Sequence, residues 1–374
     1  MKKKVKSNTM NSGNNFKGMS LFSGMGGDTL GLQKAGVEVV AFNDFDKHAI
    51  QTHKQNFTNS TLLGNEKDKY DICKIDEKDL ESYKNNIDLI FAGFPCQGFS
   101  QGGKKLPNDP RNTLFREFVR FSKIIKPKYI IGENVDGLLN RKTDKDEYFI
   151  DVICKEFDNI GYNLKYQVCH IVQHGAPQLR KRLIIVGIRK DLSKVFTFPE
   201  PLNDRKNDLP GLLDIIEFSM EGTMKIKKED YDFSSLPEEC IVKDLNNEED
   251  EDSNNIHPYL KMKVNSKDVE HNGKKLKNLI SFGKRESPLH IEIIDIRKPS
   301  KTIICTYDHQ PRLFVPIQNK KGYYLRCLLP DELKQIQGFP KDFKLCGNKK
   351  QKIKQIGNAV PPPLIERIVK KILY

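Results

Sequence analysis

The stretch MSLFSGMGGDTLGLQKAGVEVVAFNDFD, residues 19–46, decides the fold of this chain. It contains two short apolar runs, 19–23 and 37–43, separated by a glycine-rich turn and by apolar residues at helical spacing. The order strand, glycine loop, helix and strand is the repeating unit of doubly wound parallel sheets. Because ligands of such sheets bind beyond the carboxyl ends of the strands, the stretch also predicts a binding site at the glycine loop.

The same alternation of strands and helices continues to about residue 190. Helical spacing recurs twice, and four further apolar runs read as strands, at 87–92, 129–131, 168–172 and 183–188. We therefore expect an α/β fold with a doubly wound, mostly parallel sheet of the Rossmann-like type. Beyond about residue 191, prolines and polar low-complexity stretches replace this rhythm, which indicates a second, smaller and mixed domain.

Four segments follow from these changes of pattern. Residues 1–17 form a basic, polar tail that we expect to be disordered, and 18–190 form the larger domain. Residues 191–352 form the smaller domain, whose acidic run 248–252 is expected to be a solvated surface loop. In 353–374, apolar residues share one face of a predicted helix, which needs an apolar partner, expected in the larger domain.

Composition narrows the class of protein. The 374 residues carry 63 Lys and Arg against 50 Asp and Glu, a net charge of +13, which favours a polyanionic partner. No signal peptide and no apolar run of about 18 residues is present, so we expect a soluble, cytoplasmic protein without a membrane partner. The eight cysteines include no C-x-x-C pair, which predicts neither a disulfide framework nor a metal site.

The glycine loop and the end of the next strand predict a nucleoside site. Gly24 and Gly26 allow a ligand to approach the backbone, and about twenty residues later Asp44 could accept both hydroxyls of a ribose. Phe45 could stack on a purine. A dinucleotide is the rival ligand, but its fingerprint needs Gly or Ala where this chain has Thr29. An adenosyl ligand without a pyrophosphate fits better.

Two further motifs place reactive side chains near neighbouring strand ends. In GFPCQGFS, residues 93–100, Pro95 cannot donate a backbone hydrogen bond, so Cys96 should leave the sheet. Taken alone, such a cysteine is more often a small buried apolar residue than a nucleophile. In IIGENVDGL, Glu133 and Asn134 are expected just past another strand end, so a thiol and a carboxyl would meet in one crevice.

The motif GAPQLRKRLIIVGIR places Arg180 and Arg182 at alternate positions as the chain enters an apolar strand. Alternate positions face the same side of a strand, so we expect the two guanidinium groups to point together. They could bind phosphate or polarise a substrate oxygen, and a solvated basic edge is the alternative.

Taken together, these motifs resemble the DNA (cytosine-5) methyltransferase family. The matches occur in the family's order and cover nearly all of 18–190 and roughly 322–374; they are FSGMGG, Asp44-Phe45, Asp71 in YDICKID, GFPCQGFS, ENV, QLRKR and QIGNAVPPPL. The resemblance implies an S-adenosylmethionine-dependent methyltransferase fold with double-stranded DNA bound between two lobes. It also implies that 191–352 is a target-recognition domain and that the C-terminal helix returns to the catalytic domain.

The resemblance also assigns roles to matching residues. Cys96 is the implied nucleophile, and Glu133 is the implied contact to cytosine N3 and its exocyclic amine. Arg182 matches an arginine that supports the base O2 and the catalytic cysteine region, and Arg180 matches a neighbouring active-site arginine. The positions that match the cofactor lining are Phe22, Gly24, Gly26, Asp44, Phe45, Asp71, Ile72, Pro95 and Asn358.

In the smaller domain the resemblance is weakest. Basic residues there are candidate phosphate or base contacts, with a solvated surface charge as the alternative for each: Lys284, Arg285, Arg297, Lys298, Lys301 and Arg312. The expected enzyme is a monomer of a restriction-modification system or a solitary enzyme, with a separate cognate endonuclease as a possible partner. Three alternatives stay open. They are a transfer-RNA cytosine-5 methyltransferase, whose Cys-Phe-Thr motif is absent here, a catalytically inactive DNA-binding homologue, and a nicotinamide-dependent dehydrogenase.

Overall fold

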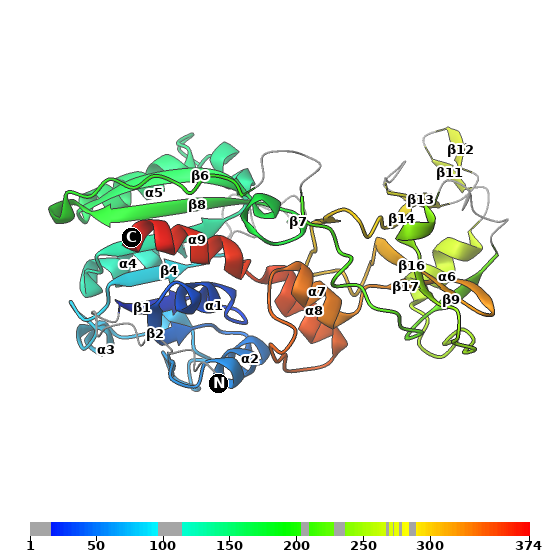
Figure 1. The fold of residues 1–374 in the computed structure, drawn as a ribbon. Helices are drawn as coiled ribbons and strands as arrows, with labels where there is room; N and C mark the ends of the chain where they lie inside the picture. The colour runs from blue at the N-terminus through cyan, green and yellow to red at the C-terminus, as the bar shows by residue number, and fades with distance from the viewer. Residues whose placement is uncertain are drawn as a thin grey trace, which may run out of the picture.

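The computed structural model describes residues 16–95, 114–202, 209–227, 236–266, 269–271, 273–276, 279–283 and 289–374. The described chain forms two lobes, and the C-terminal helix lies in the larger one (Figure 1). Cys96 lies outside the described residues, as do Lys284 and Arg285. Within the described ranges, no helix has both the length and the apolar character needed to cross a membrane.

A seven-stranded sheet forms the centre of the larger lobe. Its strand order is β3-β2-β1-β4-β5-β8-β6, and all neighbouring strands are parallel except β8, which runs antiparallel to β5 and β6. The predicted doubly wound, mostly parallel sheet is confirmed. Because the strand order reverses between β1 and β4, a ligand crevice is expected at the carboxyl ends of these two strands. The strands are β1 (Phe16–Leu21), β2 (Val37–Asn43), β3 (Thr61–Leu62), β4 (Leu89–Ala92), β5 (Tyr129–Asn134), β6 (Tyr162–His170) and β8 (Lys181–Arg189).

Some ends of these strands differ from the prediction. β1 begins at Phe16, so the last two residues of the predicted disordered tail belong to the sheet. Glu133 and Asn134 are the last two residues of β5 and not the residues beyond it, because β8 still pairs with both. The predicted strand 168–172 is the end of the longer β6, and a 3-10 turn begins at Ile171. Pairing with neighbouring strands determines where each strand begins and ends. A local apolar pattern in the sequence does not show this pairing.

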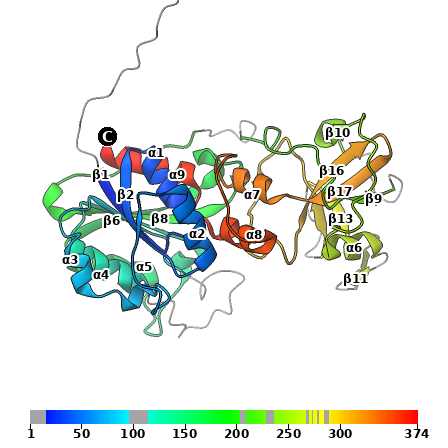
Figure 2. The same ribbon diagram turned by 90° about the horizontal axis from the view of Figure 1, so that it is seen from below.

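Helices cover both faces of the large sheet (Figures 1 and 2). Successive residues of a strand point to opposite faces, so Ile130 packs with the helices of one face and Ile131 with those of the other. The first face is covered by α3 (Glu77–Glu81), α4 (Phe115–Ile125) and α5 (Phe149–Asn159), and the second by α1 (Gly27–Lys34) and α9 (Pro362–Leu373). α2 (Lys47–Asn56) is capped at its N-terminus by Asp46, whose carboxylate accepts from the His48 and Ala49 amides.

The C-terminal helix α9 has the apolar face that its residue spacing predicts. Five of its side chains have no exposed surface: Leu364, Ile365, Ile368, Val369 and Ile372. α9 crosses α1 at Gly31, where an added Cβ would lie 2.7 Å from both Ile365 Cβ and the Pro362 carbonyl oxygen. Glycine is therefore needed for this close approach. The helix before it, α8 (Lys349–Asn358), spans the boundary predicted between 352 and 353, so that division falls inside a helix.

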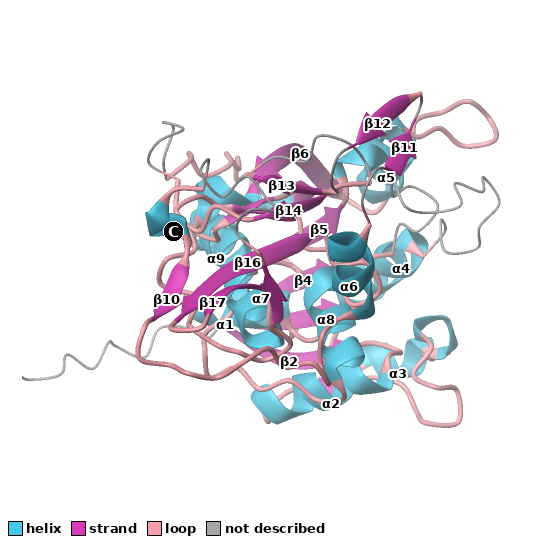
Figure 3. Cartoon of the chain, turned by 90° about the vertical axis from the view of Figure 1, so that its right-hand side faces the viewer, coloured by secondary structure: helices cyan, strands magenta, loops and turns pink. Residues whose placement is uncertain are grey.

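The smaller lobe is built on a second, mixed sheet, and this lobe faces the viewer in Figure 3. Its order is β13-β14-β16-β17-β9, and β10 pairs with β16. β14 runs parallel and β17 antiparallel to β16. The strands are β9 (Met224–Ile226), β10 (Val242–Asp244), β13 (Ile280–Phe282), β14 (Ile291–Ile293), β16 (Leu313–Asn319) and β17 (Gly322–Cys327). The remaining elements are α6 (Pro258–Asn265), the hairpin β11 (Val269–His271) and β12 (Lys274–Leu276), and α7 (Pro330–Ile336).

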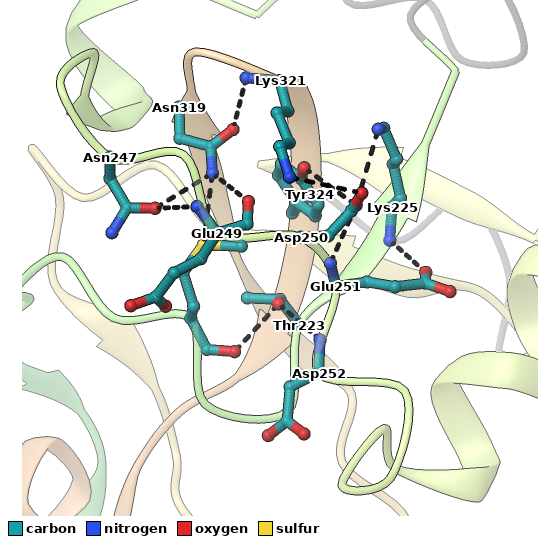
Figure 4. Close-up of polar contacts among 11 residues, drawn as sticks. Thr223, Lys225, Asn247, Glu249, Asp250, Glu251, Asp252, Asn319, Lys321 and Tyr324 are labelled. Carbon is teal, nitrogen blue, oxygen red and sulfur yellow. Dashed lines mark hydrogen bonds and ion pairs between the residues drawn. The ribbon is translucent and has the colours of Figure 1, made fainter.

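The acidic run 248–252 is held against this second sheet, so it is more than the solvated loop that was predicted (Figure 4). Its side chains are mostly exposed, as like charges require, but they accept hydrogen bonds from the sheet edge. Asp252 accepts from the Gly222 amide at 2.9 Å, and Glu251 accepts from the Lys225 amide at 2.9 Å. Asn319 donates to the Glu249 carbonyl at 2.8 Å. The Lys225 amide of β9 and the Gly222 amide just before this strand therefore hold the acidic segment against the sheet.

Candidate active site

The glycine loop leaves the carboxyl end of β1 through three residues with positive φ. Phe22 has φ 56°, Gly24 55° and Gly26 92°. A Cβ at Gly26 would lie 2.3 Å from the Phe57 ring, whereas a Cβ at Gly24 would meet nothing within 4 Å. Gly26 is therefore needed for packing beneath the loop. Gly24 leaves open space above the backbone, in which a ligand could lie.

Asp44 supports this loop from the end of β2. Its side chain is only 8% exposed, and its two oxygens accept from the Gly24 and Asp46 amides, each at 2.8 Å. Burial raises the pKa of Asp44 above its usual value, and these two hydrogen bonds act in the opposite direction. The neighbouring Phe45 ring is 72% exposed. An exposed ring beside a buried carboxylate suits a ligand with an aromatic base and hydroxyl groups.

Asp71 and Ile72 lie on the next turn along this edge. Asp71 is exposed and caps a 3-10 turn by accepting from the Cys73 amide at 3.0 Å. The Ile72 side chain is buried in the core, and Arg120 of α4 donates to the Ile72 carbonyl at 3.0 Å. The Asn43 side chain donates to the Tyr70 carbonyl at 3.0 Å, which ties this turn to the end of β2.

The segment after α8 crosses the start of α1. A Cβ at Gly27 would lie 2.0 Å from the Val360 carbonyl oxygen, and a Cβ at Gly93 would contact the Val360 side chain at 3.7 Å. Asn358, the last residue of α8, is exposed two residues before this crossing. The structure thus brings the GNAV motif near the C-terminus against the glycine loop and the GFP motif, as a shared site requires.

Asn134 fixes the base of the segment that carries Cys96, a role that sequence reasoning did not assign to it. Its side chain is buried and donates to the Phe94 carbonyl at 3.2 Å, while its oxygen accepts from the Val135 amide at 2.8 Å. Pro95, the last described residue before Cys96, is half-buried. The sequence contained a signal for this role of Asn134, because an amide side chain buried at a strand end, directly after Glu133, needs hydrogen-bond partners.

Glu133 and Arg182 form an ion pair at the carboxyl end of β5, where this strand pairs with β8. Arg182 Nε lies 2.7 Å from Glu133 Oε1, and the two side chains are 15% and 12% exposed. Arg182 Nη1 also donates to the Lys181 carbonyl at 2.7 Å. Because two bonds hold the guanidinium, the carboxylate of Glu133 has a fixed direction. The carboxylate of such a pair is oriented and can hydrogen-bond a polar ring.

Arg180 differs from its prediction as a second group on the same strand face. It precedes β8, is only 3% exposed, and its guanidinium donates to backbone carbonyls of Ile303, Gly357 and Ala359. The spacing rule that places Arg180 beside Arg182 holds only within a strand, and the strand begins one residue later. The structure therefore brings Arg182, but not the tip of Arg180, to Glu133.

Several basic residues predicted to contact DNA are paired within the smaller lobe. Arg297 and Lys298 contact the buried Asp295 at 2.9 and 3.0 Å, and Lys301 pairs with Glu292. These ion pairs hold the pKa of Asp295 below its usual range against the effect of burial. Within the described ranges, no group of three or more His, Cys, Asp or Glu side chains could hold a metal ion.

Known proteins are similar to this chain over most of its length. A family model described as C-5 cytosine-specific DNA methylase matches residues 16–374. The type II methyltransferase M.FnuDI of Fusobacterium nucleatum is 31% identical over 362 residues, which cover 96% of this chain and 94% of that protein. M1.HphI of Haemophilus parahaemolyticus is 29% identical, with 95% and 86% covered.

Solved structures show the same fold. A prophage-encoded DNA modification methyltransferase candidate from Escherichia coli superposes with a TM-score of 0.60 at 25% identity, covering 96% of this chain and 98% of that one. A DNMT2 variant from Spodoptera frugiperda has a TM-score of 0.62 at 20% identity, covering 96% and 100%. At that identity, the second likeness concerns the fold alone.

Proposed function

Since this chain belongs to the C-5 cytosine-specific DNA methylase family, we propose that it methylates C5 of one cytosine within a specific sequence of duplex DNA, using S-adenosylmethionine. The reaction proceeds through a covalent bond between Cys96 and C6 of a cytosine that is flipped out of the helix. The observation that carries this proposal is the Glu133–Arg182 pair at the strand edge where the glycine loop and Pro95 also lie.

Cysteine and glutamate suit this reaction because cytosine C5 is a poor nucleophile. Addition of the Cys96 thiolate to C6 makes C5 enamine-like, which is covalent catalysis. Glu133, directed by Arg182, hydrogen-bonds N3 and the exocyclic amine and so stabilises the charge that develops on the ring. C5 takes the methyl group, with S-adenosylhomocysteine as the leaving group, and loss of the C5 proton to water then lets the C6–S bond break and restores the thiolate. Neither ring face is accessible in a stacked duplex, so the base must leave the helix.

The residues of the glycine loop fit S-adenosylmethionine, which when bound supplies the electrophilic methyl group. The open space above Gly24 receives the ligand, the Asp44 carboxylate accepts from the ribose hydroxyls, and the exposed Phe45 ring stacks on the adenine. Asn358 borders the same loop through the crossing of Val360 over Gly27. The other proposed lining residues are Phe22, Gly26, Asp71, Ile72 and Pro95.

Replacing Asp44 by asparagine is expected to weaken S-adenosylhomocysteine binding roughly 10- to 100-fold, measured by titration calorimetry. Hydrogen bonds to a charged acceptor contribute about 1.5–3 kcal/mol, and the new amide would direct an N–H towards the Gly24 or Asp46 amide. Asp46→Asn is the matched control. The Asp46 carboxylate caps α2 and pairs with Lys354, so its change should leave affinity as it was. Wild-type affinity in Asp44→Asn would remove Asp44 from the site.

The partners follow from the same proposal. Double-stranded DNA is the substrate, and the net charge of +13 favours its approach. The curated relatives reported above are type II methyltransferases, so a separate cognate endonuclease is the proposed partner in the cell. We further propose that the enzyme acts as a monomer in the cytoplasm, at the nucleoid.

The direct test is methyl transfer by the purified full chain. Duplex DNA and transfer RNA are incubated in parallel with labelled S-adenosylmethionine, and the DNA is then sequenced after bisulfite treatment. We expect label in DNA only, at cytosines that share one sequence context. Label confined to transfer RNA would instead support the RNA-modifying alternative, and label on adenine would contradict the chemistry.

A further inference from the structure

Three buried side chains form a polar joint between the two lobes. Gln178, Arg180 and Gln337 are each 3% exposed or less, and we call them the lobe joint. Gln178 accepts from the Ile303 amide and donates to Gln337, both at 3.1 Å, and Gln337 donates to the Ile356 carbonyl at 2.7 Å. The joint therefore connects the short strand β7 (Gln178–Leu179), the segment that contains Ile303, and the end of α8.

Arg180 is the member that binds two distant segments with one rigid group. Its Nη1 donates to the Ile303 carbonyl at 3.0 Å and to the Gly357 carbonyl at 3.1 Å, and its Nη2 donates to Ala359 at 3.4 Å. Because the guanidinium is planar and its donors are fixed relative to one another, these carbonyls cannot shift independently. Ile303 belongs to the segment from the smaller lobe, and Gly357 and Ala359 flank Asn358.

In the segment 302–305, Thr302, Ile304 and Cys305 are exposed, whereas Ile303 is buried. The Thr302 hydroxyl donates to the Leu179 carbonyl at 2.8 Å, next to Arg180, and the Ile304 side chain is 46% exposed. The backbone of 304–305 crosses directly over Gly357, where an added Cβ would lie 2.3 Å from the Cys305 amide nitrogen. A displacement of this segment would therefore reach the residue before Asn358.

The chemistry of the joint indicates a role beyond stability. A buried cation is costly, and burial lowers the pKa of Arg180 well below its usual range, with Arg182 acting in the same direction and Glu133 against it. Arg180 donates to backbone carbonyls, and within the described part of the chain its Nε has no acceptor. A charge held in this way stabilises the fold poorly compared with apolar packing.

We propose that Arg180 is a positioning residue that couples DNA binding at segment 302–305 to cofactor binding at Asn358. This inference rests on the proposed function, because it takes duplex DNA and S-adenosylmethionine as the two ligands. DNA that presses on 302–305 fixes Ile303, and Arg180 transmits that position to the carbonyls on both sides of Asn358. By linkage, each ligand then raises the affinity for the other by the same factor.

The test compares, in several variants, the ratio of the Kd of S-adenosylhomocysteine without DNA to its Kd with DNA. The Kd of S-adenosylhomocysteine is measured with and without a duplex that carries the methylated sequence found by bisulfite mapping. In the wild type we expect DNA to lower this Kd roughly 5- to 150-fold, the usual range for coupled sites. In Arg180→Lys the ratio is expected to fall close to one, because an ammonium cannot span three carbonyls.

Arg189→Lys is the matched control. Arg189 lies at the far end of β8 and pairs with Asp191 at 2.7 Å. Its replacement by lysine is therefore the same chemical change at a position away from the joint. A wild-type ratio in Arg180→Lys would overturn the proposal. If Arg180→Lys does not fold, Gly357→Ala tests the proposal instead. The added Cβ displaces the backbone of 304–305, whereas alanine is compatible with the helix α8. An unchanged ratio in that variant would overturn the proposal too.

Failure of this inference can be distinguished from failure of the proposed function. A wild-type chain that methylates no DNA contradicts the function itself. A wild-type chain that methylates DNA, but binds S-adenosylhomocysteine equally well with and without it, contradicts the coupling alone.

Discussion

Replacing Cys96 by serine is expected to lower methyl transfer on the order of 10⁴- to 10⁶-fold, the scale on which enzymes lose turnover when a covalent nucleophile is removed. A thiol with an ordinary pKa of about 8.5 already provides some thiolate at neutral pH, whereas a serine hydroxyl provides almost no alkoxide. The measurement is single-turnover transfer of label to duplex DNA. Binding of S-adenosylhomocysteine should persist, because the cradle of Gly24 and Asp44 is formed without the thiol.

The covalent step has its own readout. Wild-type enzyme should form a stable adduct with DNA that contains 5-fluorocytosine at the target, since fluorine cannot leave as the proton does, and Cys96→Ser should form none. Cys154→Ser is a suitable control, because burial raises the pKa of Cys154 to about 11 and keeps that thiol protonated. Wild-type turnover in Cys96→Ser, or an active wild-type enzyme that forms no adduct, would contradict attack at C6.

The second large effect is expected for Glu133→Gln, which should lower the single-turnover rate about 10²- to 10⁴-fold, the range for a group that hydrogen-bonds or transfers a proton in the transition state. Glutamine keeps the size of the side chain but loses the charge that Arg182 Nε contacts at 2.7 Å. The half-buried guanidinium then has no carboxylate in that position. Affinity for S-adenosylhomocysteine should stay unchanged, since the cradle lies at the ends of β1 and β2.

Asp88→Asn provides the matched comparison for Glu133→Gln. Asp88 lies at the opposite edge of the same sheet, where it contacts Lys128 at 2.7 Å and accepts from the Lys17 amide. The same change from carboxylate to amide there should alter stability slightly and leave the methylation rate as it was. Comparable rate losses in both variants would show that Glu133 acts through the fold alone. A near-normal rate in Glu133→Gln would remove it from the chemistry.

Much of the site could be predicted from the sequence because of one geometric rule. Parallel strands that lie side by side end at one edge, so motifs that follow successive strands must gather there. The rule places the glycine loop, Pro95 and Glu133 together, and the pairing of β1 with β4 and of β4 with β5 confirms it. It also explains why Asp44, after the next strand, reaches the Gly24 amide.

The sequence by itself determined the fold class and the motifs that share this edge, because apolar period and glycine position are local properties. Tertiary structure alone decided where side chains find partners from distant segments. Arg180 donates to carbonyls 123 to 179 residues further along the chain, and Val360 crosses Gly27. The acidic run 248–252 accepts from the Lys225 amide of β9 in the same way. No local sequence pattern predicts these contacts, because each hydrogen bond needs a backbone group from a distant segment, and only the folded chain places that group next to the side chain.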